Sequence, residues 1–286
     1  MKRKSSSLVL IPFAIITTIL MGFPFFWMLL SSFKSNSELF SWPPKILPSS
    51  ITFEHYVDAI STFRFGRYFF NSVIVAVLSM LINVFFCSLA GYAFACLEFP
   101  YKKLFFVLIL ATMIIPVQIT LIPTFLLVKN LPLCGGNDIF GRGGTGLLNT
   151  HIGLAVPHIM TAFGVFMMRQ FYSQFPNGLL EAARIDGARE FAIFFEIFLP
   201  LSKPGLSALA IFTFTETWND FLWPLVITRT DKMRTIQLGL EIFKGRFVND
   251  WGPLMAATVI SSIPIIVVFI LFQKQFMSMS LTSGMK

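Results

Sequence analysis

Six long apolar runs constrain the fold of this chain more than any other feature of its sequence. A helix needs about 20 mostly apolar residues to cross a bilayer, and only helices or closed barrels satisfy their backbone polar groups there. Barrel strands are short and alternate in polarity, so these long continuous runs favour helices. We therefore predict an all-α polytopic membrane protein, a single domain over 1–286 with six transmembrane helices. The predicted spans are about 8–30, 68–97, 104–128, 152–168, 204–227 and 251–273.

The composition agrees with this class of protein and argues against others. Hydrophobic residues make up 55% of the 286 and charged residues only 13%, whereas a soluble domain carries about 25% charged residues. The formal net charge is +8, but the basic residues lie at the ends of apolar runs, which suits lipid headgroups and membrane topology rather than nucleic acid. The three cysteines form no CxxC pair, so we expect no metal or redox site.

Basic residues beside the runs predict the orientation. Lys2, Arg3 and Lys4 precede the first run as they would in a secretory signal, but this run is long and no A-x-A-like cleavage site follows it, so we expect an uncleaved span. Lys102 and Lys103 occupy the shortest loop, where the positive-inside rule applies best. Both termini are then cytoplasmic, although the external loops also carry Lys and Arg among acids. The external loops are about 34–67, 129–150 and 228–250, and the internal loops are 98–103 and 169–203.

The longer internal loop, 169–203, is typical of a short helix, a break and a second helix. Pro176 and Asn177 suit a helix start with Asn177 as its cap, and Gly187 permits a turn at its end. Ala182 and Ala183 give the short helix a shallow surface that another protein could approach closely. Because both its ends are tied to spans, such a helix would pass the movement of a docked partner on to them.

The remaining part of this loop is rich in Phe and Ile, and it suits the membrane boundary. Pro200 and Pro204 should break it before the fifth span begins. The spans and loops leave no room for a separate soluble domain. We therefore expect no ATP-hydrolysing domain within this sequence.

One spacing in the loop resembles a known family. The residues reproduce E-A-A-x3-G-x9-I-x-L-P, the signature loop of the membrane subunits of ATP-binding-cassette importers. The resemblance implies a cytoplasmic coupling helix that sits in a cleft of an ATPase subunit. It implies that ATP is bound and hydrolysed on partner chains, so that this chain is a transport subunit with no cofactor of its own rather than an enzyme. The coupling residues it implies are Glu181, Ala182, Ala183, Arg184, Asp186, Gly187, Ile197, Leu199 and Pro200.

The resemblance extends over nearly the whole chain and points to the carbohydrate-uptake branch of that family. The matching stretches are 148–171, 183–188, 218–225 and 273–285. The sequences of these stretches are similar to those of the smaller membrane subunits of maltose-type transporters. This implies a second, homologous permease, two ATPase subunits and an extracytoplasmic sugar-binding protein as partners in the inner membrane.

Two acids lie inside the fifth predicted span. Glu216 and Asp220 are four residues apart, so on one helix they would share a face, and ionisable groups at membrane depth usually face a cavity or a partner. With Asn219 and Trp218 beside them, they could line a sugar path in which Trp218 or Trp223 stacks on a sugar ring. The alternative is that this polar cluster only packs against the second permease.

The second external loop is lengthened by a glycine-rich stretch, 134–146. Its glycine spacing hints at a phosphate cradle, but no Gly-Lys-Ser/Thr follows. We expect a flexible external loop, with contact to the binding protein as the alternative.

Two other classes of function compete with the importer. An intramembrane enzyme would need a catalytic constellation, and neither HExxH nor GxSxG occurs. An ion-coupled secondary carrier could use Glu216 or Asp220 as a proton site, but the loop signature argues against it. Among importer substrates, a glycerol phosphate ester would favour cations deep in the path, and the spans contain no deep Lys or Arg. This favours an uncharged sugar.

Overall fold

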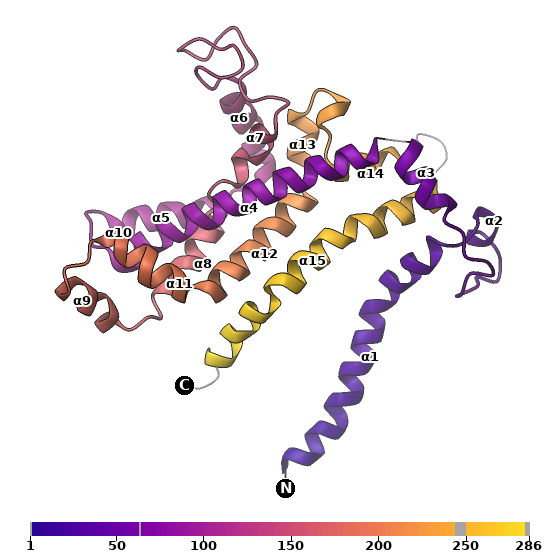
Figure 1. The fold of residues 1–286 in the computed structure, drawn as a ribbon, viewed down its shortest axis with the longest axis horizontal. Helices are drawn as coiled ribbons and strands as arrows, with labels where there is room; N and C mark the ends of the chain where they lie inside the picture. The colour runs from indigo at the N-terminus through magenta and orange to yellow at the C-terminus, as the bar shows by residue number, and fades with distance from the viewer. Residues whose placement is uncertain (1, 63, 244–249, 284–286) are drawn as a thin grey trace. The chain divides into compact units, whose positions relative to one another are not determined.

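All the regular structure that the computed structural model describes is helical (Figure 1). The described residues are 2–62, 64–243 and 250–283. They divide into two compact units, one formed by Met1–Gly66 with Gly239–Ile263 and the other by Arg67–Leu238 with Pro264–Lys286. The prediction of a single domain stays a prediction.

Three of the predicted spans are uninterrupted helices. They are α1 (Lys2–Ser31), α4 (Phe65–Cys96) and α15 (Trp251–Ser283). Their apolar stretches have mean hydropathies of 2.1, 2.5 and 2.6. These helices confirm the first, second and sixth predicted spans.

The other three predicted spans are each broken and bent. The third consists of α5 (Lys102–Thr112) and α6 (Val117–Lys129), which meet at 105°. Pro116 stands at the cap position of α6, and a proline disfavours the helical conformation of the residue before it. The fourth span consists of α7 (His151–Ala155), the 3-10 turn η1 (Val156–His158) and α8 (Ala162–Tyr172), with a bend of 51°. The predicted spans at 104–128 and 152–168 are therefore each made of bent helical segments rather than one continuous helix.

The fifth span ends earlier than expected. Helix α12 (Lys203–Asn219) stops at Asn219, and α13 (Leu222–Ile227) follows after Asp220 has turned to an extended conformation with ψ 123°. A separate helical segment precedes α12, made of α10 (Glu190–Ala192), η2 (Ile193–Phe198) and α11 (Leu199–Leu201). It meets α12 at 78°. The break that Pro200 and Pro204 predict therefore falls between them, at Ser202.

Short helices complete the description. The loop 169–203 contains α9 (Asn177–Ile185). The loops predicted to be external contain α2 (Asn36–Leu39), α3 (Glu54–Thr62), η3 (Asp231–Met233) and α14 (Ile236–Ile242).

Small residues let the spans of the larger unit approach closely. A Cβ added to Gly91 of α4 would lie 2.6 Å from the Cβ of Met168 and 2.8 Å from the backbone nitrogen of Arg169, both in α8. A Cβ added to Gly164 of α8 would lie 2.7 Å from the Sγ of Cys87. Lipid tails are as apolar as side chains, so membrane helices associate largely through such close packing. These glycines therefore position α8, and the coupling loop that follows it, against α4.

The smaller unit is held by a buried lysine and a buried histidine. Lys34 is 2% exposed, donates from Nζ to the Lys45 carbonyl at 2.6 Å, and lies 4.3 Å from the centre of the Trp27 ring. His55 Nε2 lies 2.8 Å from the Lys34 carbonyl oxygen, and Gly252 leaves room for the His55 ring. The first predicted external loop is thus folded onto the start of α15.

The close approach at Gly91 is testable. Gly91→Ala should lower the free energy of unfolding by about 1–3 kcal/mol, because the added methyl group meets backbone atoms that cannot move aside cheaply. Thermal unfolding of the purified chain in a mild detergent measures this as a lower melting temperature. Gly178→Ala is the matched control, because no atom lies within 4 Å of its added Cβ. An unchanged melting temperature for Gly91→Ala would contradict the packing.

Candidate functional site

The candidate coupling helix, α9, has well-defined ends. It begins at Asn177 with Pro176 in the cap position, so the prediction of Asn177 as the cap is wrong. A proline suits this place because its backbone has no N–H to satisfy. At the other end Gly187 has φ +80°, a conformation that a glycine adopts without cost. The Gly187 N–H donates to the Arg184 carbonyl and the Ala188 N–H to the Ala183 carbonyl, each at 3.0 Å, which confirms the predicted turn.

The outward face of α9 carries a large apolar side chain among charges. Ile185 is 85% exposed, and it is followed by exposed Asp186 and Gly187 and preceded by exposed Glu181, Ala182 and Arg184. Ala183 is only 6% exposed and packs into the core. The shallow surface predicted for Ala182 and Ala183 therefore consists of Ala182 alone, because the helix turns Ala183 inward.

One side of the segment after α9 is part of the protein core. Ile193, Phe194 and Phe198 are 0–2% exposed. The Phe198 ring lies 5.0 Å from the Tyr92 ring and 5.8 Å from the Tyr172 ring, measured between centroids. On the other side of the segment Phe191 is 70% exposed, and the predicted position at the membrane boundary stays a prediction. Within the motif, Ile197 and Leu199 pack against this core, and Pro200 is exposed in the first turn of α11.

A chain of polar contacts joins the coupling loop to α4. The Tyr92 hydroxyl donates to one carboxylate oxygen of Glu190 at 2.8 Å, and Arg184 donates to the other oxygen at 2.8 Å. Arg184 also reaches the Cys96 carbonyl at 3.5 Å. The partly exposed position of the Arg184–Glu190 pair lessens its contribution to stability, but its geometry fixes the distance between α9 and the C-terminal end of α4.

The electrostatics of this pair follow from its contacts. Partial burial raises the pKa of Glu190, but hydrogen bonds from Arg184 and Tyr92 and the positive charge of Arg184 outweigh burial, and the pKa lies below its ordinary value. The hydrogen bond to Glu190 raises the pKa of Arg184, against the effect of burial. Both groups are therefore charged at neutral pH. Sequence reasoning missed Tyr92 and Glu190, because they are 98 positions apart and no local pattern connects them.

The polar residues of the fifth span divide between two faces. Glu216 and Asn219 are exposed on the surface of the chain, and Asn219 accepts a hydrogen bond from Gln237 at 3.2 Å. Trp218 is 1% exposed, stacked on Phe214 at 5.7 Å with an interplanar angle of 13°. The predicted stacking of a sugar on Trp218 is therefore wrong for this structure, because protein atoms cover the ring.

Asp220 faces inward instead of sharing a face with Glu216. Its Oδ2 lies 3.2 Å from His158 Nε2, and its Oδ1 accepts from the Trp223 N–H at 3.2 Å. The prediction of a common face is wrong because α12 has already ended. Trp223 is 4% exposed and donates from Nε1 to the Gly153 carbonyl at 3.0 Å, so its ring is not open to a sugar either.

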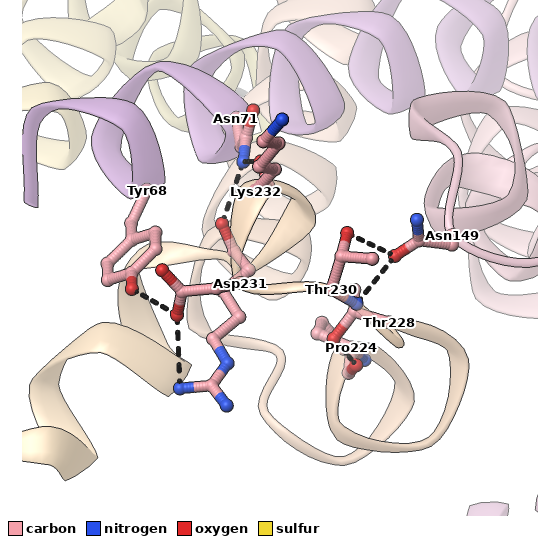
Figure 2. A network of polar contacts seen from close by, with 9 residues as sticks. Tyr68, Asn71, Asn149, Pro224, Thr228, Thr230, Asp231 and Lys232 are labelled. Atoms are coloured by element: carbon pink, nitrogen blue, oxygen red, sulfur yellow. Dashed lines mark hydrogen bonds and ion pairs between the residues drawn. The ribbon is translucent and has the colours of Figure 1, made fainter. Parts of the chain in front are cut away.

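A second polar network fixes the start of the loop after the fifth span (Figure 2). The Tyr68 hydroxyl donates to Asp231 at 2.6 Å, and Asn71 donates to the Lys232 carbonyl at 2.9 Å. The Asn149 side-chain oxygen accepts from the N–H and the hydroxyl of Thr230, each at 3.1 Å. The N-terminal end of α4 and Asn149, two residues before α7, therefore hold 229–232 in place.

The glycine-rich loop 134–146 is also ordered by side chains. Asn137 donates to the carbonyls of Lys129 and Leu131 at 2.8 and 3.0 Å, and Asp138 accepts from two backbone N–H groups within the loop at 2.8 Å. Its Gly135, Gly136, Gly141, Gly143 and Gly146 have positive φ. The prediction of a flexible loop is wrong to this extent. The loop displays Ile139 and Phe140, which are 66% and 74% exposed.

Comparisons with known proteins place this geometry in a family. Residues 88–278 match the model of the binding-protein-dependent transport system inner membrane component. The arabinooligosaccharide transport permease of Halalkalibacterium halodurans is 34% identical over 293 residues, covering 100% of both chains. The diacetylchitobiose uptake permease of Streptomyces coelicolor is 33% identical, covering 91% of this chain and 83% of the relative. The sn-glycerol-3-phosphate transport permease of Yersinia enterocolitica is 32% identical, covering 92% and 91%.

A solved structure shows the same fold. It is a bacterial ABC transporter involved in import of the acidic polysaccharide alginate, with a TM-score of 0.80, 22% identity and coverage of 96% of this chain and 98% of the solved one. The family model covers about two thirds of the sequence, and the region that it covers contains α9, the segment after it and all of α12. The chain therefore belongs to the family of binding-protein-dependent transport system inner membrane components, the permease subunits of ABC importers.

Proposed function

We propose that this permease moves a sugar or oligosaccharide across the cytoplasmic membrane, powered by ATP that is hydrolysed on partner chains. One observation carries the proposal: a short helix exposes Ile185 to a partner while Tyr92, Glu190 and Arg184 tie it to a spanning helix. In this proposal the chain itself supplies the substrate path and connects the ATPase subunits mechanically to the spanning helices.

The exposed face of α9 has the chemistry of a docking site for an ATPase subunit. A large apolar side chain at the centre of an interface, with charges around it, is the usual source of binding energy between proteins. Ile185 would fill a hydrophobic pocket, Ala182 would allow close approach, and Glu181 would face a cation of the partner. When the ATPase dimer closes, α9 moves with it, and its ties to α4 and α12 carry this movement into the spans.

The orientation follows from this docking. ATP is cytoplasmic, so α9 and the short loop with Lys102 and Lys103 face inward. Both termini then lie in the cytoplasm. The ordered loops at 134–146 and 229–232 lie outside, where Ile139 and Phe140 offer an apolar surface to a sugar-binding protein.

The second permease is proposed from the exposed face of α12. Glu216 is exposed on the surface of this chain within the predicted fifth span, and a carboxylate against lipid is costly. A homologous partner would cover this face and enclose a polar path between the two chains. Glu216, Asn219 and Gln237 would line that path.

The chemistry of the path favours a neutral, hydroxyl-rich substrate. The carboxylate accepts hydrogen bonds and the two amides both accept and donate them, which together match the hydroxyl groups of a sugar. Glu216 would repel a phosphate ester, and in the described spans the Lys and Arg residues lie near helix ends. Glycerol phosphate remains the alternative if the second permease supplies cations.

The docking role of Ile185 is tested by copurification. The tagged chain, taken from its own cells in mild detergent, should recover a second permease and an ATPase. Ile185→Asp should weaken the ATPase contact by about 2 kcal/mol or more, roughly thirtyfold in affinity, with unchanged melting because the side chain is exposed. Ile139→Asp in the external loop is the control. Recovery of the folded wild-type chain alone would favour the ion-coupled carrier instead.

The tie to α4 is tested by Tyr92→Phe, which removes one hydroxyl and keeps the ring. A hydrogen bond to a charged group contributes about 1.5–3 kcal/mol, so the transport driven per ATP hydrolysed should fall about tenfold while the ATPase stays bound. Uptake and phosphate release, measured together in vesicles that contain the whole complex, give this ratio. Tyr101→Phe, at an exposed tyrosine of the next loop, should change nothing. A ratio that is unchanged in Tyr92→Phe would show that the hydroxyl is not part of the coupling.

The path is tested by Glu216→Gln, which keeps the size of the side chain and removes its charge. Loss of the charge-assisted hydrogen bond that a sugar hydroxyl donates to this carboxylate should reduce uptake of a labelled arabinooligosaccharide about tenfold. Glu54→Gln, an exposed acid at the start of α3, is the control. Normal uptake by Glu216→Gln would mean that Glu216 only packs against the second permease. Faster uptake of glycerol 3-phosphate by this variant would favour the ester.

A further inference from the structure

A pocket of about 700 Å³ lies where α4 ends, α5 begins and α8 passes. Three cations and several aromatic rings line it, among them Lys102, Lys103, Arg169, Phe94 and Phe106. None of these residues has a part in the transport mechanism proposed above. We propose that this pocket binds the phosphate headgroup of an anionic phospholipid of the inner leaflet.

The pocket carries an excess of positive charge. Lys102 is partly neutralised, because its Nζ lies 3.2 Å from Glu98 and donates to the Leu97 carbonyl at 2.6 Å. Glu98 is the one acid among the lining residues, and its side chain is 92% exposed. The three cations and the one acid therefore leave the pocket with a net charge of about +2, mainly from Lys103 and Arg169. A bound anion would balance this charge.

The start of α5 adds to this field. Its first turn contains two lysines and no acid, and Tyr101 at the cap position makes no side-chain cap. The N-terminus of a helix carries partial positive charge and favours anions, so cations there are unfavourable on their own. A phosphate in the pocket would offset the repulsion among the lysines and the helix end.

Contacts with two phenylalanine residues hold the Arg169 guanidinium in an orientation that suits phosphate binding. Its guanidinium lies 4.1 Å from the centre of the Phe106 ring, and its Nε donates to the Phe94 carbonyl at 3.4 Å. Stacking and this bond fix the plane of the group. A guanidinium has five N–H donors, so its terminal amino groups can form the paired hydrogen bonds that arginine makes with phosphate.

The apolar wall identifies the phosphate as part of a lipid rather than a soluble ion. Phe94, Phe106 and Val107 line the same pocket, and Leu104, Phe105 and Val107 of α5 are 50–59% exposed. The short loop between two spans places the cations at the membrane surface. A phospholipid can set its phosphate among them and lay its acyl chains along α5. This inference depends on the inward orientation proposed above, but its test does not require a working transporter.

The experiment uses the full-length chain, purified in a neutral detergent and titrated with phosphatidylglycerol or with phosphatidylcholine. Native mass spectrometry counts the bound lipids. We expect a preference for phosphatidylglycerol, and an apparent Kd about fivefold higher in Lys103→Gln, the effect of one lysine at a membrane surface. Lys103→Arg should restore binding. Lys129→Gln, which removes a charge at the far end of α6, should bind like the wild type, and all variants should melt at the same temperature.

Three results would overturn the proposal. Equal binding of the two lipids, or equal Kd values for wild type and Lys103→Gln, would show that no anion site exists here. A preference for phosphatidylglycerol that inorganic phosphate abolishes by displacing the lipid would assign the site to a soluble ion. Because binding is measured on the chain alone, failure to recover an ATPase with the chain leaves this test unaffected.

Discussion

The hydrocarbon core offers no water to a backbone group, so every break in a spanning helix must be satisfied by the protein itself. This constraint decides where the polar side chains of the larger unit lie. At the break in the fourth span, Asn83 donates to the His158 carbonyl at 2.8 Å and the Thr161 hydroxyl accepts from the Gly164 N–H at 3.1 Å. At the end of α12, Asp220 accepts from the Trp223 N–H at 3.2 Å. Residues 113–115, before Pro116, close tight turns on the carbonyls of 110–112.

Polar side chains that form hydrogen bonds at these helix breaks are not available to bind a substrate. Polar residues of the spans therefore fall into two kinds, those bonded within the protein and those open to a ligand, and the sequence does not distinguish them. Asn83 also accepts from Thr213 at 3.1 Å, so a single amide joins α4, the bend before α8 and α12. Asp220 is occupied in the same way by His158 and a backbone N–H. Glu216 lies within α12, away from these helix breaks, and is exposed on the surface of the chain. It is therefore the acid of the span that a substrate or a partner can reach.

The sequence predicted the class of fold well, because hydropathy and length report directly on the cost of burying backbone in lipid. It also predicted the turn at Gly187 and the break between Pro200 and Pro204, because glycine and proline act locally. It failed where the answer depends on contacts between distant segments. Nothing near Trp218 distinguishes a ring open to sugar from one stacked on Phe214, since α12 carries polar and apolar residues on all sides. The partnership of Tyr92 with Glu190 needs the packing of α4 against the loop, which glycines such as Gly91 set.

The route from the coupling helix to the spans has two branches of different character. One is the polar contact of Arg184 and Glu190 with Tyr92, which ends on α4. The other is covalent, through α10, η2 and α11 into α12, and it includes a π-helical stretch at Ile193–Phe198 and a bend of 78°. Close-packed aromatic rings transmit strain because they cannot be compressed, and π-helical turns often occur at functional sites. Under the docking that we propose, a push on α9 would reach α4 and α12 together. Since α12 carries Glu216, the same push would move the polar face that we propose lines the substrate path.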